Sequence, residues 1–461
     1  MVVSRGRTQN TKREPANTQP LGVQVSYGIG QIAGQVFRDV PSLLLLFFMT
    51  NILGISPAVA GTAIFVPKLL VGSICDVIVG AFVDKWRERV PLHWWLLFGA
   101  IFAPIAIYLL FNVPDFGSSG KLIYVISIVS LYMLVFASFS VPYLAIATAI
   151  SNTSHQRTLL MAWRLVFTAI GVLIAGGAAP AFIAAAGGGE VAYSQMSIIL
   201  GVLCFVTLLI AFFGVRRSVS EKPTPADIEL ETKLSLREML SAIRAQRFSV
   251  LLFINIMQLA GSGMTYAAML YFLSYAMVLD NPFGVIGFIT LSITAGIIIG
   301  QPIWVFLSKR YGKKQIYIAA TILHAIAQMG WALTAQAGGI PGAVFFAFFV
   351  GLGNSGWAML GFSMVADIAD EGRTGLFSSV WIAADKIGFA LGGTFLIGLV
   401  LSGFGFDSAR AVAGLEQSAS AVTGVVVGFG LAPAGLYFIS ALIFYIWGQE
   451  TTAPQASTLS D

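Results

Sequence analysis

The 461-residue sequence has very little charge. Aspartate, glutamate, lysine and arginine together make up 10% of it, against about a quarter of an average soluble domain. Hydrophobic residues, in contrast, make up 57%. This balance excludes an ordinary soluble domain and indicates a protein that faces lipid.

Cysteine, histidine and recognisable catalytic motifs are also scarce. The two cysteines, Cys75 and Cys204, fall inside apolar runs, where a disulfide framework has no use, so we expect them to pack as small hydrophobes. The histidines are scattered, and no HExxH, CxxC, GxSxG or P-loop pattern occurs. His93 and His155 lie in or beside predicted loops, whereas His324 is expected to be a hydrogen-bonded helix-packing residue rather than a proton relay. An enzyme or a receptor is therefore disfavoured, and no cofactor or metal site is expected.

Long apolar runs are what the sequence has instead. Runs of eighteen or more residues recur along almost the whole chain, and each can cross a hydrocarbon core of ~30 Å at ~1.5 Å per residue. We expect an all-α integral membrane protein with twelve transmembrane helices. No cleaved signal peptide is expected, because no small-residue cleavage site follows the basic N-terminal stretch. The predicted spans are 24–51, 57–83, 92–113, 121–150, 159–187, 194–214, 247–277, 282–308, 315–335, 340–366, 376–403 and 421–447.

The basic residues of the loops are strongly asymmetric. Most of the 26 lysine and arginine residues fall in the N-terminal tail and in the loops of one side, whereas the loops of the other side carry only Lys121 and Arg410. By the positive-inside rule we predict that both termini are cytoplasmic and that the protein spans the cell (inner) membrane. The pI of about 9.1 then reflects attraction to lipid headgroups, and no nucleic-acid partner is expected.

The chain divides into two similar halves. Six spans lie on either side of the connection 215–246, and a charged loop follows the second span of each half, as GAFVDKWRER and as WVFLSKRYGKK. Two six-helix halves with a solute site between them near mid-membrane are the architecture of the major facilitator fold. The predicted organisation is a cytoplasmic tail (1–23), an N-terminal half (24–214), the cytoplasmic connection (215–246), a C-terminal half (247–447) and a second cytoplasmic tail (448–461).

The connection contains one amphipathic stretch. In SLREMLSAIRAQRF, the residues Leu236, Leu240 and Ile243 share one helical face, and Ser235 with Glu238 has capping-box spacing. This pattern predicts a short helix at the inner membrane surface, and the alternative is an early start of the seventh span.

A few ionisable residues lie inside the predicted spans. Each costs at least ~2.5 kcal/mol at mid-membrane, so such residues usually face a cavity and have a function. A carboxylate placed like Asp76 can accept a proton, because burial disfavours its charged form. The alternative is that the cations are static salt-bridge partners that hold or gate the halves. The excess of cations favours an anionic or polar solute. These residues are Arg38, Asp39, Lys68, Asp76, Arg164, Asp385 and Lys386.

Four stretches resemble one transporter family. They are SYGIGQIAG in the first span, CDVIVGAFVDKW in the second, VPYLAIATAISNTSHQRTLLMAWRL over 141–165 and ADIADEGRTGLFSSVWIAADKIGFALGG over 366–393. With them the chain resembles the glycoside-pentoside-hexuronide:cation symporter family, the melibiose-carrier branch of the major facilitator superfamily. The resemblance implies a secondary active transporter that couples a cation to a small polar solute by alternating access.

The charges within the spans and the resemblance together give the candidate residues. The substrate-binding candidates are Gln35, Arg38, Asp39, Ser140, Tyr143, Arg164 and Lys386, and the cation-coupling candidate is Asp76. The candidates for a gating or loop motif are Asp84, Arg87, Arg157, Asp367, Asp370 and Arg373.

The chain also departs from the family pattern. Sugar-carrying members use an acid on the first span and another on the fourth, where this chain has Gln35 and Ser140. The family's second coupling carboxylate is replaced by Gly72, and its nearby amide by Cys75. Since a sodium site needs several oxygen ligands, the departures favour a proton over sodium. They also favour a solute such as a hexuronide or another sugar acid, although a glycoside remains a candidate.

The expected partners are therefore a small-molecule solute, a coupling cation (H+ or Na+) and the lipid bilayer, with the protein acting as a monomer. Two alternatives keep the fold. One is a transporter of an amphiphile such as a lysolipid, and the other is a uniporter or exporter, because a single sequence does not say which gradient drives transport.

Overall fold

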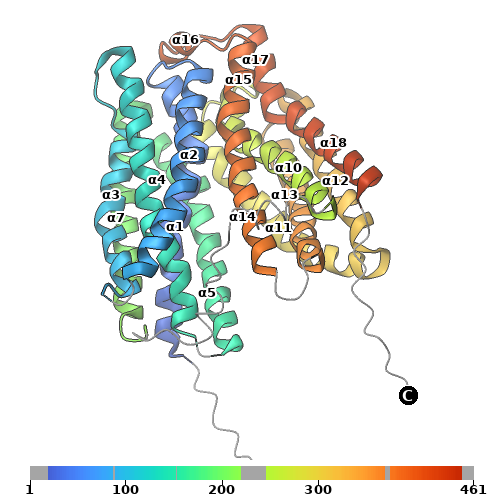
Figure 1. Cartoon of the computed structure of the whole chain (residues 1–461). Coiled ribbons are helices and arrows are strands. Elements are labelled where there is room, and N and C mark those ends of the chain that lie inside the picture. The colour runs from blue at the N-terminus through green and yellow to red at the C-terminus, as the bar shows by residue number, and fades with distance from the viewer. Residues whose placement is uncertain (1–18, 87–88, 152, 220–245, 369–373, 449–461) are drawn as a thin grey trace, which may run out of the picture.

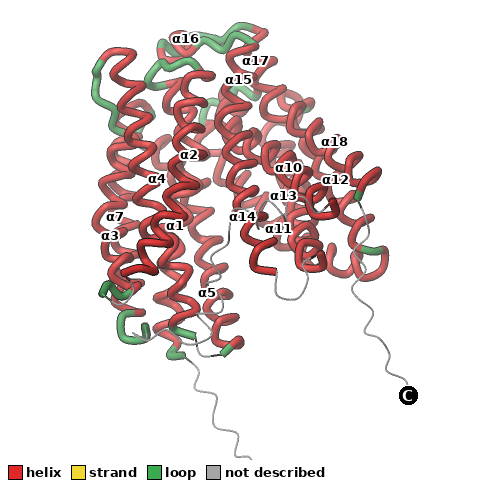
Figure 2. Tube along the Cα trace, in the orientation of Figure 1, coloured by secondary structure: helices red, strands yellow, loops and turns green. Residues whose placement is uncertain are grey.

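The computed structural model describes residues 19–86, 89–151, 153–219, 246–368 and 374–448. Within these ranges all the regular secondary structure is helical, and Figure 2 shows helices joined by short loops. Twelve of the helices described are long and apolar enough to span a membrane, which confirms the predicted number. The predicted helix in the connection 215–246 falls mostly on 220–245, outside the described residues.

The first six spans form one bundle, coloured blue to green in Figure 1. Polar caps fix some of the helix starts: the Thr153 side chain accepts a hydrogen bond from the Gln156 N–H at the start of the fifth span. The helices are α1 (Leu21–Asn51), α2 (Pro57–Trp86), α3 (Leu92–Phe111), α4 (Gly117–Ala149), α5 (Ser154–Leu173), the π-helical segment η1 (Ile174–Ala178), α6 (Ala179–Ala185) and α7 (Gly189–Val215).

The last six spans form the second bundle, coloured yellow to red in Figure 1. The Asn281 side chain caps its second span by accepting from the Gly284 N–H. The helices are α10 (Gln246–Tyr271) with η2 (Phe272–Ala276), α11 (Pro282–Tyr311), α12 (Lys313–Leu333), α13 (Ala335–Ile368), α14 (Thr374–Ala390) with η3 (Leu391–Leu396) and α15 (Ile397–Gly403), the short α16 (Ser408–Val412), and α17 (Ala419–Val426) with η4 (Val427–Leu431) and α18 (Ala432–Trp447).

Hydrogen bonds join the two bundles at the end where α1 stops and α2 starts, which we call the sealed end. The Tyr271 hydroxyl lies 2.5 Å from the Thr50 hydroxyl, and the Ala58 N–H donates to the Ser402 hydroxyl at 2.8 Å. Further bonds at this end run from Ser408 to the Ile55 carbonyl, from Tyr275 to Asn51 and from Thr290 to the Gly176 carbonyl. The sealed end is at the top of Figure 1.

Glycines bring the helices of the two bundles into direct backbone contact near the sealed end. A Cβ atom on Gly61 of α2 would lie 2.3 Å from the Thr394 carbonyl oxygen of η3, and one on Gly398 of α15 would lie 2.5 Å from the Pro57 carbonyl oxygen. Neither position has room for a methyl group. At the opposite end, which we call the basic end because the basic loops emerge there, the ribbons of the two bundles stand apart in Figure 1.

Candidate solute and coupling site

One face of α1 is open although the helix lies inside the protein. Almost all of α1 is buried, but Arg38 keeps 63% of its side chain exposed, and Gln31 and Gly34 on the same face are partly exposed. A Cβ atom on Gly34 would meet only the Gln31 amide, at 3.9 Å. We call Gln31, Gly34 and Arg38 the open face of α1. Because neighbouring helices surround α1, this face lines an open space in the interior.

The candidates at the upper end of this face form a local charge cluster. Asp39, with 12% of its side chain exposed, accepts hydrogen bonds from Gln35 Nε2 at 2.6 Å and from Arg38 Nε at 2.9 Å. The Gln35–Asp39 pair has the i, i+4 spacing that places two side chains on one helical face. The structure thus brings three sequence-predicted candidates together, with the Asp39 carboxylate neutralised by Arg38.

Two residues from other helices approach this cluster. Lys68 of α2 is half-buried and lies close enough to Asp39 for an electrostatic interaction. Tyr266 of α10 lies within electrostatic reach of both Arg38 and Asp39, and its buried hydroxyl has no hydrogen-bond partner in the part of the chain described. With Lys68 included, the cluster carries one positive charge in excess. Tyr266 is a residue that sequence reasoning missed, because a tyrosine in an apolar span gives no distinguishing signal.

Arg164 of α5 extends the polar surface toward the basic end. Its Nε donates to Gln31 Oε1 at 2.9 Å, so its partner on the open face of α1 is a neutral amide, and no carboxylate among the described residues pairs with it. Arginine has five N–H donors, and most of these remain for a solute. Tyr143 is 5% exposed. Its hydroxyl donates to the Tyr27 carbonyl at 2.7 Å and its ring stacks on the Tyr27 ring, so it positions α1 beside α4.

Asp76 and Lys386 form an ion pair between the two halves. Lys386 Nζ of α14 lies 2.5 Å from Asp76 Oδ2 of α2. The two side chains are 60% and 28% exposed respectively, so the pair borders an accessible space. The sequence indicated that Asp76 is too far along α2 to pair with Lys68, and the structure shows that its partner comes from the opposite half. Among the seven charged residues of the spans, this pair alone bridges the halves within the described chain.

A second carboxylate lies next to Lys386. Asp385 is half-buried, and its Oδ1 accepts a hydrogen bond from Asn255 Nδ2 of α10 at 2.6 Å. Asn255 is 2% exposed, so its amide fixes the Asp385 side chain from inside the C-terminal half. Sequence reasoning included Asp385 among the charged candidates of the spans without assigning it a role, and it missed Asn255.

The remaining candidates are not part of the pairs described above. Ser140 is half-buried on α4 and makes no side-chain hydrogen bond with the rest of the described chain. Arg157 Nε approaches the Ser151 hydroxyl at 3.5 Å, and Asp367 pairs with Lys313 Nζ at 2.5 Å at the basic end. Outside the description fall the side chain of Asp84 and the whole of Arg87, Asp370 and Arg373.

The interior of the C-terminal half is polar but uncharged around Gln258. Its amide donates to the Thr321 hydroxyl at 3.1 Å and to the Ser440 hydroxyl at 3.2 Å, and it accepts from the Tyr317 hydroxyl at 2.7 Å. His324 Nδ1 accepts from the Trp357 indole N–H at 3.1 Å, as expected for a helix-packing histidine. These polar side chains form hydrogen bonds with one another and contribute no charge. Of the four cations of the site, only Lys386 comes from the C-terminal half.

Comparison with known proteins agrees with this fold. Residues 26–447 match the family model described as MFS/sugar transport protein. The inner membrane symporter YicJ of Escherichia coli K12 is 26% identical over 430 residues, covering 91% of this chain and 90% of that protein. A proposed sulfoquinovose importer of the same organism is 24% identical, with 94% and 92% covered. The crystal structure of a NupG nucleoside transporter variant, 14% identical, superposes with a TM-score of 0.68 over 93% of this chain and 100% of that one.

Proposed function

Because the chain belongs to the MFS/sugar transport protein family, of the glycoside/cation symporter type, we propose that it is a symporter that moves a small polar solute together with a cation by alternating access. Membership of this family makes it a multi-pass membrane transporter rather than an enzyme. In our proposal it lies in the inner membrane, acts as a monomer and has both termini in the cytoplasm. The predicted division into two halves, a connection and two tails is part of the same proposal.

The observation that carries the proposal is the Asp76–Lys386 ion pair between the halves. A cation that binds Asp76 neutralises the carboxylate, so Lys386 loses its partner and becomes available to a solute anion. An anion that binds Lys386 in turn frees Asp76 to take up a cation. Cation and solute therefore favour each other's binding, and this reciprocity is what symport requires.

A proton fits this role better than sodium. Gly72, one turn before Asp76, and Cys75 beside it offer no side-chain oxygen, and the nearest atom to a Cβ on Gly72 would be the Met133 sulfur at 3.6 Å. Sodium needs several oxygen ligands, whereas a proton needs only the carboxylate.

The charges around the open face of α1 favour an anionic sugar derivative. Four cations, Arg38, Lys68, Arg164 and Lys386, stand against three described carboxylates, Asp39, Asp76 and Asp385. A positive excess therefore remains in the solute-free site, and it is removed when an anion binds. A relative is a proposed importer of sulfoquinovose, a sugar that carries a sulfonate group, and this supports a hexuronide or another sugar acid ahead of a neutral glycoside. Gln35, Ser140 and Tyr143 remain proposed as uncharged members of the substrate site.

The residues near the basic end are proposed to gate transport. The Asp367–Lys313 pair joins the end of α13 to the start of α12. Arg157 lies at the start of α5. Asp84, Arg87, Asp370 and Arg373 belong to the same proposed motif by sequence.

The experiment that tests the solute class is thermal unfolding of the purified protein with methyl glucoside, methyl glucuronide and sulfoquinovose. A ligand that binds only the folded state stabilises it by RT ln(1 + [L]/Kd), which is ~2.7 kcal/mol at a hundredfold excess over Kd. We expect both acids to raise the unfolding temperature and methyl glucoside to have a much smaller effect. Arg164→Ala should lose the response to the acids, and Arg310→Ala, an exposed arginine at the basic end, is the matched control.

Other outcomes would redirect the assignment. A shift with methyl glucoside alone would mean that the cations serve structure or gating, and a shift with lysolipid alone would favour the amphiphile transporter. Solute flux in proteoliposomes that is unaffected by a proton or sodium gradient would identify a uniporter. Solute flux in the direction opposite to an inward proton or sodium gradient would identify an exporter.

A further inference from the structure

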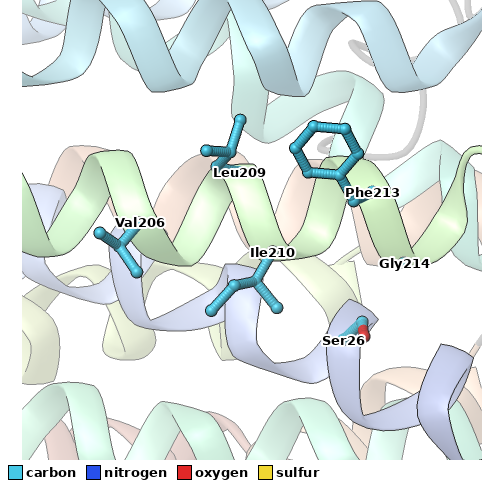
Figure 3. Close-up of a pocket in the computed structure, with 6 residues that line it drawn as sticks. All are labelled: Ser26, Val206, Leu209, Ile210, Phe213 and Gly214. Carbon is cyan, nitrogen blue, oxygen red and sulfur yellow. The ribbon is translucent and has the colours of Figure 1, made fainter.

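A groove lies along α7 beside the start of α1, and Figure 3 shows the residues that line it. It has a volume of about 450 Å³ and is lined by Val206, Leu209, Ile210, Phe213 and Gly214 of α7, with Ser26 of α1. Val206, Ile210 and Phe213 are 40–52% exposed, so the lining is apolar and open to the bilayer.

The groove is closed off where the two helices touch. A Cβ atom on Gly214 would lie 2.1 Å from the Ser26 Cβ, and one on Gly30 would lie 2.9 Å from the Ala211 Cβ, so α1 and α7 pack against each other beneath the groove, and Ser26 and Gly214 close one end of it. A slot of this shape, closed at one end and open along one side, fits a flexible hydrocarbon chain rather than a helix of another protein.

The closed end of the groove lies at the level of the membrane surface. Phe212, next to the groove, contacts Trp94 of α3 at a ring separation of 5.8 Å, and Trp94 is 50% exposed. Exposed tryptophans of membrane proteins gather at the boundary between hydrocarbon and headgroups. From Arg216 to Val206, α7 rises ~15 Å at ~1.5 Å per residue, which is half of a ~30 Å hydrocarbon core. The groove itself, from Gly214 to Val206, accounts for ~12 Å of this rise, which is most of the length of one leaflet.

Two cations lie at the headgroup level, just beyond the closed end of the groove. The Arg216 guanidinium lies 5.0 Å above the Phe213 ring, which forms part of the groove wall, and Arg217 follows it. Both arginines are exposed, and neither pairs with a carboxylate within the described chain. A phosphate held here would place the chain attached to it directly over Phe213, Ile210 and Val206.

We propose that this groove is a binding site for an anionic phospholipid, with the acyl chain along α7 and the phosphate on Arg216 and Arg217. The occupant is a lipid because the lining faces the bilayer, and it is anionic because Arg216 and Arg217, the charged groups described beside the groove, are cations. In the orientation proposed from the basic loops, the leaflet is the cytoplasmic one. This site is independent of the proposed transport function.

The test uses the full-length protein in detergent, with phosphatidylglycerol or phosphatidylcholine of identical acyl chains added in mixed micelles. Native mass spectrometry counts the retained lipids, and the shift in unfolding temperature reports their affinity. We expect phosphatidylglycerol to be retained and to raise the unfolding temperature more than phosphatidylcholine. One basic residue near an anionic lipid surface changes the affinity about fivefold, so Arg216→Ala should weaken phosphatidylglycerol binding by about that factor.

The controls separate this site from general attraction to a basic surface. Arg310 lies 5.4 Å above the Tyr311 ring at the basic end of α11, in the same arrangement but away from the groove, so Arg310→Ala should leave the tightly retained lipid in place. Arg216→Lys should keep most of the affinity, and Val206→Trp should release the lipid by filling the far end. Equal retention of the two lipids by the unmodified protein, or equal losses in Arg216→Ala and Arg310→Ala, would overturn the proposal.

Discussion

Replacing Gly61 by alanine should push the two halves apart at the sealed end. The added Cβ would lie 2.3 Å from the Thr394 carbonyl oxygen and 3.1 Å from its carbon, so α2 must move by about 1 Å to reach an ordinary contact distance. Overpacking of this kind costs about 1–3 kcal/mol. The gain in helix propensity, about 1 kcal/mol, is the same in every conformation and cancels from their equilibrium.

The cost falls only on the conformation in which these helices touch. A bias of 1–3 kcal/mol changes a conformational equilibrium about 5- to 150-fold, so a state open at this end should become readily detectable. Gly435→Ala is the matched control, because no atom lies within 4 Å of its added Cβ and it also places alanine within a spanning helix.

The assay is electron-electron double resonance between spin labels on Pro114 and Leu415, which are exposed in loops at the sealed end of the two halves, with both native cysteines replaced. We expect Gly61→Ala to add a population at longer distance that Gly435→Ala lacks. Identical distance distributions in the two variants would refute the reasoning, since they would show that the contact between α2 and η3 does not limit separation.

Three further predictions concern the charged residues. Asp76→Asn should retain exchange of solute but lose proton-driven accumulation in proteoliposomes, and undiminished accumulation would remove Asp76 from the coupling step. Lys386→Ala and Arg164→Ala should each abolish stabilisation by sugar acids while insertion and folding persist, as size-exclusion chromatography can check; normal responses in both would make these residues structural. Asp385→Ala should lower the free energy of unfolding by about 1–3 kcal/mol, because it leaves the buried Asn255 amide unpaired, whereas Asp385→Asn can keep that hydrogen bond, and equal losses in the two would contradict the assignment.

The fold was largely predictable because the bilayer imposes a simple length rule. Apolar runs gave all twelve spans, and the repeat of charged loops was the basis for predicting two halves. The helix boundaries in the structure differ from the predicted span boundaries mainly where polar or glycine residues continue a helix beyond its apolar run. For example, the sixth span was predicted to start at 194, whereas α7 starts at Gly189.

The sequence showed which charged residues lie within the spans but not how they pair. Helical spacing shows that Asp76 and Lys68 are too far apart to pair, but no spacing rule connects Asp76 to Lys386 in the other half. The neutral partners Gln31 and Asn255 were missed because an amide in an apolar span is cheaper to bury than a charge and gives a weaker signal.

The π-helical segment η3 lies in the eleventh span between Lys386, which forms the ion pair, and Gly398, which packs closely against α2. An α-helix advances ~100° per residue, and a π-bulge interrupts this register by the equivalent of one inserted residue. The bulge therefore sets the directions of Lys386 before it and Gly398 after it relative to each other, so that Lys386 pairs with Asp76 of α2 and Gly398 packs against Pro57 at the start of the same helix. Deleting one residue from Leu391–Leu396 would rotate one part against the other by about a quarter of a turn, so the eleventh span could no longer present both its cation and its close-packed glycine to the first half.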